Sequence, residues 1–142
     1  MKRLSYTVDN CKYIDFAATG IHDTGFLVDT RQNERQIPFA VKRMYYMYDI
    51  PQEQSRGGHA HKDLQQVVLA LQGGFSLKLH DGLRSRNVRL EKPGTGLHLV
   101  PGIWREVYGF TPNAICMVLA SEIYDEADYI RNFQAFLNFR NM

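Results

Sequence analysis

Two histidines, His59 and His61, stand one residue apart directly after a pair of glycines. Side chains at positions i and i+2 of an extended strand point to the same face, so we expect the two imidazoles to be aimed into one space. Because the ordinary pKa of histidine is about 6.5, such a pair could exchange protons with a substrate near neutral pH. The same pair could instead hold a metal ion, if further ligands surrounded it.

Two later positions argue against a metal site. In many small β-barrels of the cupin type, a Gly-rich segment and His-x-His precede a glutamate, and a histidine after a later proline completes the ligand set. This chain has Gln66 at the glutamate position and Arg105, after Pro101, at the histidine position. A neutral amide is a weak ligand, and a guanidinium stays protonated. We therefore predict imidazoles that act as acid and base, with weak binding of an ion by two imidazoles and water as the alternative.

An arginine and a tyrosine share one face of another expected strand. The segment 39–49 is rich in tyrosine, methionine and valine, and it places Arg43 and Tyr45 on the same side. If that side faces the interior of a barrel, the buried guanidinium requires an anion. The alternative is a surface arginine beside a half-buried tyrosine. Arg56 could likewise bind a phosphate or simply close a turn.

Two of the positions that replace metal ligands could serve the same cavity. Gln66 could orient one of the histidines by hydrogen bonding. Arg105 follows a Pro-Gly turn and Trp104, and we expect it to point toward the histidines. The alternative is a tryptophan that plugs the mouth of a barrel beside a surface ion pair of Arg105 and Glu106.

Composition limits the class of protein and of partner. The 142 residues, 44% hydrophobic and 23% charged, predict one domain over 1–142. The net charge is only +2 and the basic residues are scattered, which fits a phosphate-bearing small molecule better than nucleic acid. We see no signal peptide and no stretch near the roughly 20 apolar residues of a membrane span. Cys11 and Cys116 lack metal or redox spacing, so we expect a reduced cytoplasmic protein.

Short strands divided by turn residues predict an all-β sandwich or barrel. Asp81-Gly82 is a hairpin signal between two of these strands. The expected strands cover residues 12–14, 26–28, 39–49, 66–71, 75–80, 87–90, 96–100, 104–110 and 114–121. Residues 19–25 are expected to form a loop.

The tail differs from the rest and predicts a C-terminal α-helix packed against the barrel. The apolar residues with helical spacing are Tyr129, Ile130, Phe133, Phe136 and Leu137. Asp125 and Glu126 suit the first turn of that helix, since acidic side chains stabilise a helix N-terminus. We therefore expect residues 124–131 to begin a helix rather than to contribute to catalysis.

Four segments occur in an order that resembles one family. They are Lys42–Tyr46, Arg56–Lys62, Pro101–Glu106 and Leu119–Arg131. Together they resemble the nucleotide-sugar 3,4-ketoisomerases of bacterial polysaccharide biosynthesis, over about two thirds of the chain. The resemblance implies a cupin fold, a jelly-roll barrel, in a homodimer without a cofactor or a catalytic metal.

The resemblance also implies a reaction and a pathway. The substrate would be dTDP-4-keto-6-deoxyglucose and the product the corresponding 3-keto-6-deoxy sugar, formed through an enediol. A PLP-dependent aminotransferase would then aminate C3, and the 3-amino-3,6-dideoxy sugar would enter glycans such as the O-antigen of lipopolysaccharide.

By the same resemblance, His59 is the base that moves the carbon-bound proton. His61 and Tyr45 are the next candidates, to carry the hydroxyl proton or to polarise the developing enediolate. Arg43 and Arg56 would meet the diphosphate or the hexose. Family members vary between histidine and arginine after the tryptophan, and Arg105 favours the gluco over the galacto product. A second variable position, near Thr24, holds neither expected residue.

Three other functions stay open at the level of sequence. A dTDP-sugar 3,5-epimerase would act on a similar substrate with a second proton donor on the opposite ring face. A non-catalytic sugar-nucleotide-binding cupin would bind without exchanging carbon-bound protons. A metal-dependent oxygenase would need the ligands that Gln66 and Arg105 replace.

Overall fold

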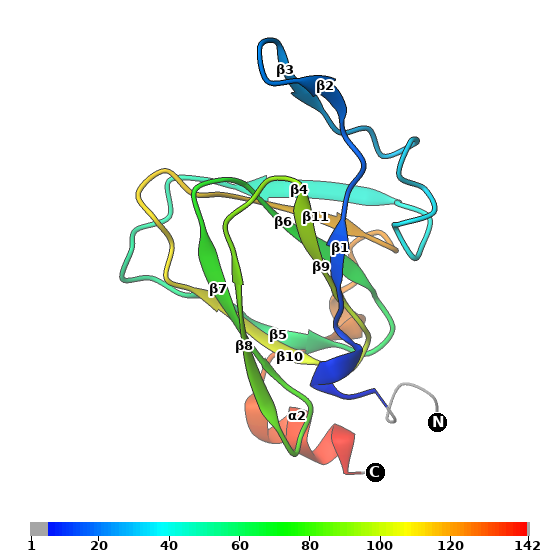
Figure 1. Ribbon diagram of the computed structural model, residues 1–142. Helices are drawn as coiled ribbons and strands as arrows, with labels where there is room; N and C mark the ends of the chain where they lie inside the picture. Colours follow the sequence, from blue (N-terminus) through cyan, green and yellow to red (C-terminus); the bar gives the residue numbers. More distant parts are fainter. Residues whose placement is uncertain (1–5, 142) are drawn as a thin grey trace.

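The computed structural model describes residues 6–141 as a barrel of two antiparallel sheets that face each other (Figure 1). The first sheet has the strand order β1-β9-β6-β11-β4, and the second has the order β12-β5-β10-β7-β8. The strands of the first sheet are β1 (Tyr13–Asp15), β4 (Arg43–Met47), β6 (Gln66–Gln72), β9 (Thr95–Leu99) and β11 (Ile115–Ala120). Those of the second are β5 (Arg56–His61), β7 (Phe75–His80), β8 (Ser85–Leu90), β10 (Trp104–Tyr108) and β12 (Tyr129–Ile130). The predicted all-β cupin barrel is confirmed.

Alternation of side chains fixes which face of each strand meets the core. In β7, Phe75, Leu77 and Leu79 are fully buried, whereas Lys78 between them is exposed. The predicted hairpin at Asp81-Gly82 joins β7 to β8, and Gly82 has φ of 101°, a value that favours glycine. The main core lies between the sheets, and the same inward faces line the functional cavity.

A hairpin of β2 (Thr19–Ile21) and β3 (Gly25–Leu27) extends away from the barrel (Figure 1). The prediction of a loop over residues 19–25 is therefore wrong. Gly20 made this segment look like a turn, but it serves a close approach between strands. A Cβ on Gly20 would lie 2.0 Å from the carbonyl oxygen of Gly25.

The C-terminal helix α2 (Phe133–Arg140) begins four residues later than the apolar spacing predicts. The residues before it form a short 3₁₀ helix, η2 (Glu126–Asp128), and then β12, which pairs with β5. Asn132 caps α2, because its side chain accepts a hydrogen bond from the Ala135 amide at 2.9 Å. Strand pairing and this cap override the helical periodicity.

Helix α2 packs on the outer face of the second sheet. Phe136 is fully buried against Trp104 of β10, with 5.7 Å between ring centroids. Ala60 of β5 belongs to the same buried cluster. The helix thereby holds the two strands that carry His59 and Arg105. Among residues 6–141, no helix has the length and apolar character that crossing a membrane would require.

Candidate active site

A cavity of about 230 Å³ lies between the two sheets and collects most of the predicted functional residues. Its polar lining comes from β4, β5, β6, β10, β12 and the residue after β12. These polar residues are Arg43, Tyr45, Arg56, His59, Gln66, Arg105, Tyr129 and Arg131. Six of the seven residues predicted from sequence therefore meet in one space, and His61 is the exception.

The two imidazoles lie on the same face of β5, as the spacing predicts. Their ring centroids are 4.8 Å apart and their planes nearly perpendicular. Tyr129 closes this cluster, with its ring centroid 5.0 Å from that of His59 and 4.3 Å from that of His61. His59 lines the cavity, whereas His61 is fully buried behind it. The two histidines therefore occupy different positions relative to a bound ligand.

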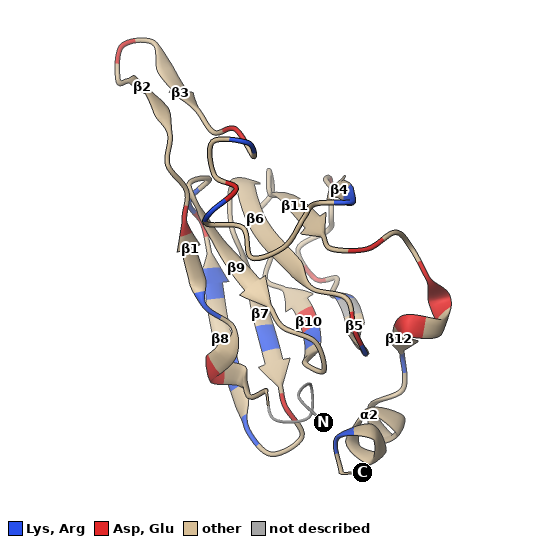
Figure 2. Ribbon diagram, turned by 90° about the vertical axis from the view of Figure 1, so that its right-hand side faces the viewer, with Lys and Arg blue, Asp and Glu red and all other residues tan. Residues whose placement is uncertain are grey.

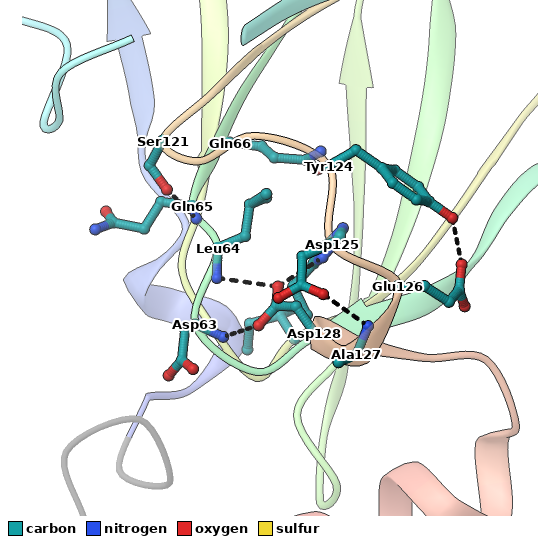
Figure 3. Close-up of polar contacts among 12 residues, drawn as sticks. Asp63, Leu64, Gln65, Gln66, Ser121, Tyr124, Asp125, Glu126, Ala127 and Asp128 are labelled. Atoms are coloured by element: carbon teal, nitrogen blue, oxygen red, sulfur yellow. Dashed lines mark hydrogen bonds and ion pairs between the residues drawn. The ribbon is translucent and has the colours of Figure 1, made fainter. Parts of the chain in front are cut away.

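Asp128 holds His61 in place. Its Oδ2 lies 3.0 Å from His61 Nδ1, and its two carboxylate oxygens accept hydrogen bonds from the backbone amides of Asp63 and Leu64 (Figure 3). An ionised carboxylate accepts a hydrogen bond from Nδ1–H, and in this tautomer the lone pair of His61 Nε2 is free. Within residues 6–141, this buried Nε2 has no hydrogen-bond partner.

Burial keeps both histidines neutral. Desolvation, followed by the positive charge of Arg105, lowers the pKa of His59 and of His61 to about 2. Neutral imidazole is the form that accepts a proton, so His59 is in the correct state to act as a base at neutral pH.

A chain of hydrogen bonds crosses the cavity from Arg105 to Tyr45. Arg105 Nη1 donates to Gln66 Oε1 at 2.6 Å, and Gln66 Nε2 donates to the Tyr45 hydroxyl oxygen at 3.3 Å. Gln66 thus orients an arginine and a tyrosine, and the prediction that it orients a histidine is wrong. Burial raises the pKa of Tyr45, so its hydroxyl stays protonated and can donate.

Arg105 is almost completely buried and pairs across the strands with His59. Its Nε donates to the Ile103 carbonyl at 3.2 Å. Its Nη2, by contrast, has no hydrogen-bond partner within the described part of the chain. Trp104, the preceding residue, faces the other way, toward α2, and donates to Glu106 at 3.0 Å. The alternative of Trp104 at the mouth of the barrel is therefore wrong.

Three more arginines line the cavity. The Arg43 guanidinium lies 4.8 Å from the Tyr45 ring centroid, and Arg56 comes from the start of β5. The Arg131 guanidinium lies 4.0 Å from the Tyr129 ring centroid. The Glu126 carboxylate accepts hydrogen bonds from Arg131 Nε at 2.8 Å and from Arg131 Nη2 at 2.9 Å. These hydrogen bonds hold the pKa of Glu126 near 2.

Asp128, Tyr129 and Arg131 were not predicted as parts of the site, because their segment was interpreted as the start of a helix. The available signal was that they fall within the last of the four segments that carry the family resemblance.

Across residues 6–141, there is no group of three or more His, Cys, Asp or Glu side chains arranged to hold a metal ion.

Comparisons with known proteins agree with this geometry. The model of the FdtA family, described as WxcM-like, C-terminal, matches residues 9–141. A TDP-4-oxo-6-deoxy-α-D-glucose-3,4-oxoisomerase of Aneurinibacillus thermoaerophilus is 42% identical over 116 residues, which is 82% of this chain and 83% of the relative.

Two solved structures extend the comparison. A 3,4-ketoisomerase from Helicobacter canadensis superposes with a TM-score of 0.86 at 35% identity, covering 94% of this chain and 98% of its own. The sugar 3,4-ketoisomerase QdtA of Thermoanaerobacterium thermosaccharolyticum, in complex with TDP, gives 0.87 at 34% identity, covering 94% and 96%. A variant of QdtA was solved with TDP-4-keto-6-deoxyglucose. This chain therefore belongs to the FdtA family and is an enzyme of the sugar 3,4-ketoisomerase class.

Proposed function

We propose that this enzyme converts TDP-4-keto-6-deoxyglucose to the TDP-3-keto-6-deoxy sugar by proton transfer between side chains and substrate. The relatives are named for this reaction class, and the QdtA variant holds this ketosugar. The observation that carries the proposal is a neutral His59 and the unpartnered Nη2 of Arg105, both at the cavity.

The reaction moves two hydrogens and needs no net oxidant or reductant. A base removes the proton from C3, and the electron pair of that C–H bond forms the C3–C4 double bond of an enediol. A proton is then delivered to C4. The C3 hydroxyl gives up its proton as the C3 carbonyl forms, and the former C4 carbonyl oxygen becomes a hydroxyl.

The geometry suggests one role for each polar group. His59 removes the C3 proton, and the imidazolium so formed can deliver a proton to C4. The free Nη2 of Arg105 donates to the oxygen that develops negative charge, in a site where burial strengthens that interaction. Tyr45 is placed to donate its hydroxyl proton to the second oxygen.

His61 acts through its neighbours in this proposal. It packs edge to face on His59 and is itself fixed by Asp128 at 3.0 Å. Asp128 is therefore a positioning residue, which sets the tautomer and the ring orientation of His61. His61 Nε2 can accept a hydroxyl proton if the substrate or a water reaches it.

The arginines suit the diphosphate. Arg43, Arg56 and Arg131 supply three guanidinium groups to the same cavity, and guanidinium binds phosphate oxygens in a bidentate manner. Arg131 is already neutralised by Glu126, so Arg43 and Arg56 are the first candidates.

We further propose a gluco product, which Arg105 supports through its position after Trp104. An exposed apolar hairpin supports a homodimer, because Ile21, Phe26 and Leu27 are each about 60% exposed. A cytoplasmic location and a downstream PLP-dependent aminotransferase that acts at C3 remain predictions.

The test is proton NMR of the enzyme with TDP-4-keto-6-deoxyglucose in D₂O, coupled to a C3 aminotransferase that traps the product. We expect a 3-amino sugar with deuterium at C4, and the couplings of H4 in the same product made in H₂O distinguish gluco from galacto. Exchange at C5 would instead indicate a 3,5-epimerase. Tight binding without exchange would indicate a sugar-nucleotide-binding protein.

A further inference from the structure

One side of the active-site cavity is apolar. Its lining residues on this side are Met47, Val68, Leu77, Val107, Cys116 and Val118. Five of them are among the buried residues of the core between the two sheets, and Met47 packs against that core. Burial raises the pKa of the Cys116 thiol to about 12, so it stays neutral and behaves as a small hydrophobic side chain.

This apolar wall starts beside the reacting groups. Along β4, the inward residues run from Arg43 through Tyr45 to Met47, and Val118 and Cys116 stand opposite the last two. On the other sheet, Arg105 is followed on the same face by Val107. The hydrogen bonds from Arg105 through Gln66 to Tyr45 join the two sheets at this level. Strands β4 and β10 therefore both change from polar to apolar in this direction, and Arg56 of β5, which pairs with Val107, is a charged residue beside the wall.

The proposed substrate has one ring substituent without oxygen. In a 4-keto-6-deoxyhexose, C4 has C3 on one side and C5 on the other, and C5 carries the C6 methyl group. When C3 and C4 face His59, Tyr45 and Arg105, the methyl group lies two bonds from C4. It is the only substituent of the sugar ring that is apolar, as the wall is.

We propose that the wall formed by Met47, Val107, Cys116 and Val118 receives the C6 methyl group and selects 6-deoxy over 6-hydroxy sugar nucleotides. This inference rests on the proposed function and adds the residues that determine specificity. A 6-hydroxyl group would be buried against hydrocarbon and a thiol, where its lost hydrogen bonds with water are poorly replaced. Pockets of this kind discriminate against an added hydroxyl by about 10- to 100-fold.

The test compares two stable ligands that differ only at O6, TDP-6-deoxyglucose and TDP-glucose, by isothermal titration calorimetry. We expect the wild-type enzyme to bind the 6-deoxy compound about 10-fold more tightly or better. Cys116→Ser, which adds a hydroxyl at nearly constant shape, should reduce this ratio at least about threefold. Val118→Thr is a second, independent variant with the same expected direction.

Cys11→Ser is the matched control. Cys11 is fully buried in the same core but does not line the cavity, so the variant should keep the wild-type ratio. A wild-type ratio near one in an enzyme that exchanges deuterium would overturn the inference and leave the proposed function standing. Equal ratios in the three variants would overturn it as well. Absence of both exchange and nucleotide binding would overturn the proposed function, and this inference with it.

Discussion

At the scale of single residues, the two histidines differ more in their surroundings than in their chemistry. His59 borders the cavity, whereas His61 lies behind it and is bound to Asp128. Both are uncharged in the free enzyme, since burial and Arg105 lower the pKa of each. The proposed roles, His59 as the base and His61 as its support, therefore rest on the positions of the two side chains.

Asp128→Asn tests that division. The amide keeps one oxygen but loses the charge that holds the Nδ1 proton of His61. We expect kcat to fall about 10- to 100-fold, with KM changed less than threefold, as is typical when an orienting carboxylate is lost. Asp125→Asn, which alters an exposed cap of η2 in the same segment, should leave kcat unchanged. Wild-type kcat in Asp128→Asn would show that His61 needs no carboxylate.

The lowered pKa of His59 also predicts how stability depends on pH. Between pH 2 and 6.5 the unfolded chain binds a proton that the folded His59 does not, so stability falls as the pH drops below 6.5. At pH 5.5 this linkage costs about 1.4 kcal/mol. Urea unfolding at pH 7.5 and 5.5 should show a smaller loss in His59→Asn than in the wild type. His22→Asn, in the exposed hairpin, should match the wild type; parallel losses in all three proteins would contradict the assignment.

Most of the cavity lining was predictable from residue spacing and resemblance. Arg43 and Tyr45 were placed together by strand alternation, and Arg105 by its offset from the Pro-Gly turn. Asp128 and Arg131 were not predicted to lie at the cavity, because an acidic and aromatic segment is equally typical of the start of a helix. Only the pairing of β12 with β5, a contact between residues far apart in sequence, brings them to the histidines.

At the scale of elements, α2 supports the strands that carry the site. Phe136 fills the space between the helix and Trp104. Phe136→Ala should lower the free energy of unfolding by about 3–5 kcal/mol, because a large fully buried ring is removed. Phe133→Ala, at a position of the same helix that is 40% exposed, should cost less than about 2 kcal/mol. Equal losses in urea unfolding would contradict the packing described.

Strands β6 and β7 were predicted to within a residue, β7 from its alternation and β6 as an apolar segment that ends before Gly73-Gly74. The expected strand 39–49 shortens to Arg43–Met47, and Asp49 beyond it has φ of 55°, outside the extended region. The predicted start of the C-terminal helix was wrong for a different reason. Asn132 is a strong N-cap, but Tyr129 and Ile130 before it continue the helical spacing of apolar residues although they belong to β12.

At the scale of the whole molecule, the β2–β3 hairpin is the most unusual feature of the surface. It stands apart from the barrel, and Figure 2 shows little charge along its strands. Met44 and Tyr46, on the outward face of β4, are also exposed apolar side chains. The strand pair could not be foreseen from local spacing, because strands of three residues are too short to show a clear alternation.

Phe26→Asp should therefore weaken the proposed dimer and shift sedimentation velocity profiles toward the monomer at micromolar concentration. A charge introduced into an apolar contact loses its hydration without gaining a partner. Leu83→Asp is the control, because Leu83 is 90% exposed at the turn between β7 and β8. A wild-type protein that sediments as a monomer would contradict the proposal.

The most direct test of the account is deuterium exchange by wild type and His59→Asn, side by side, with TDP-4-keto-6-deoxyglucose in D₂O. We predict that the wild type places deuterium at C3 of the substrate and C4 of the product. His59→Asn should show no exchange while binding TDP within about threefold of the wild type, since His59 is not assigned to the nucleotide. Exchange in His59→Asn at a rate close to that of the wild type would contradict the central claim that His59 is the base.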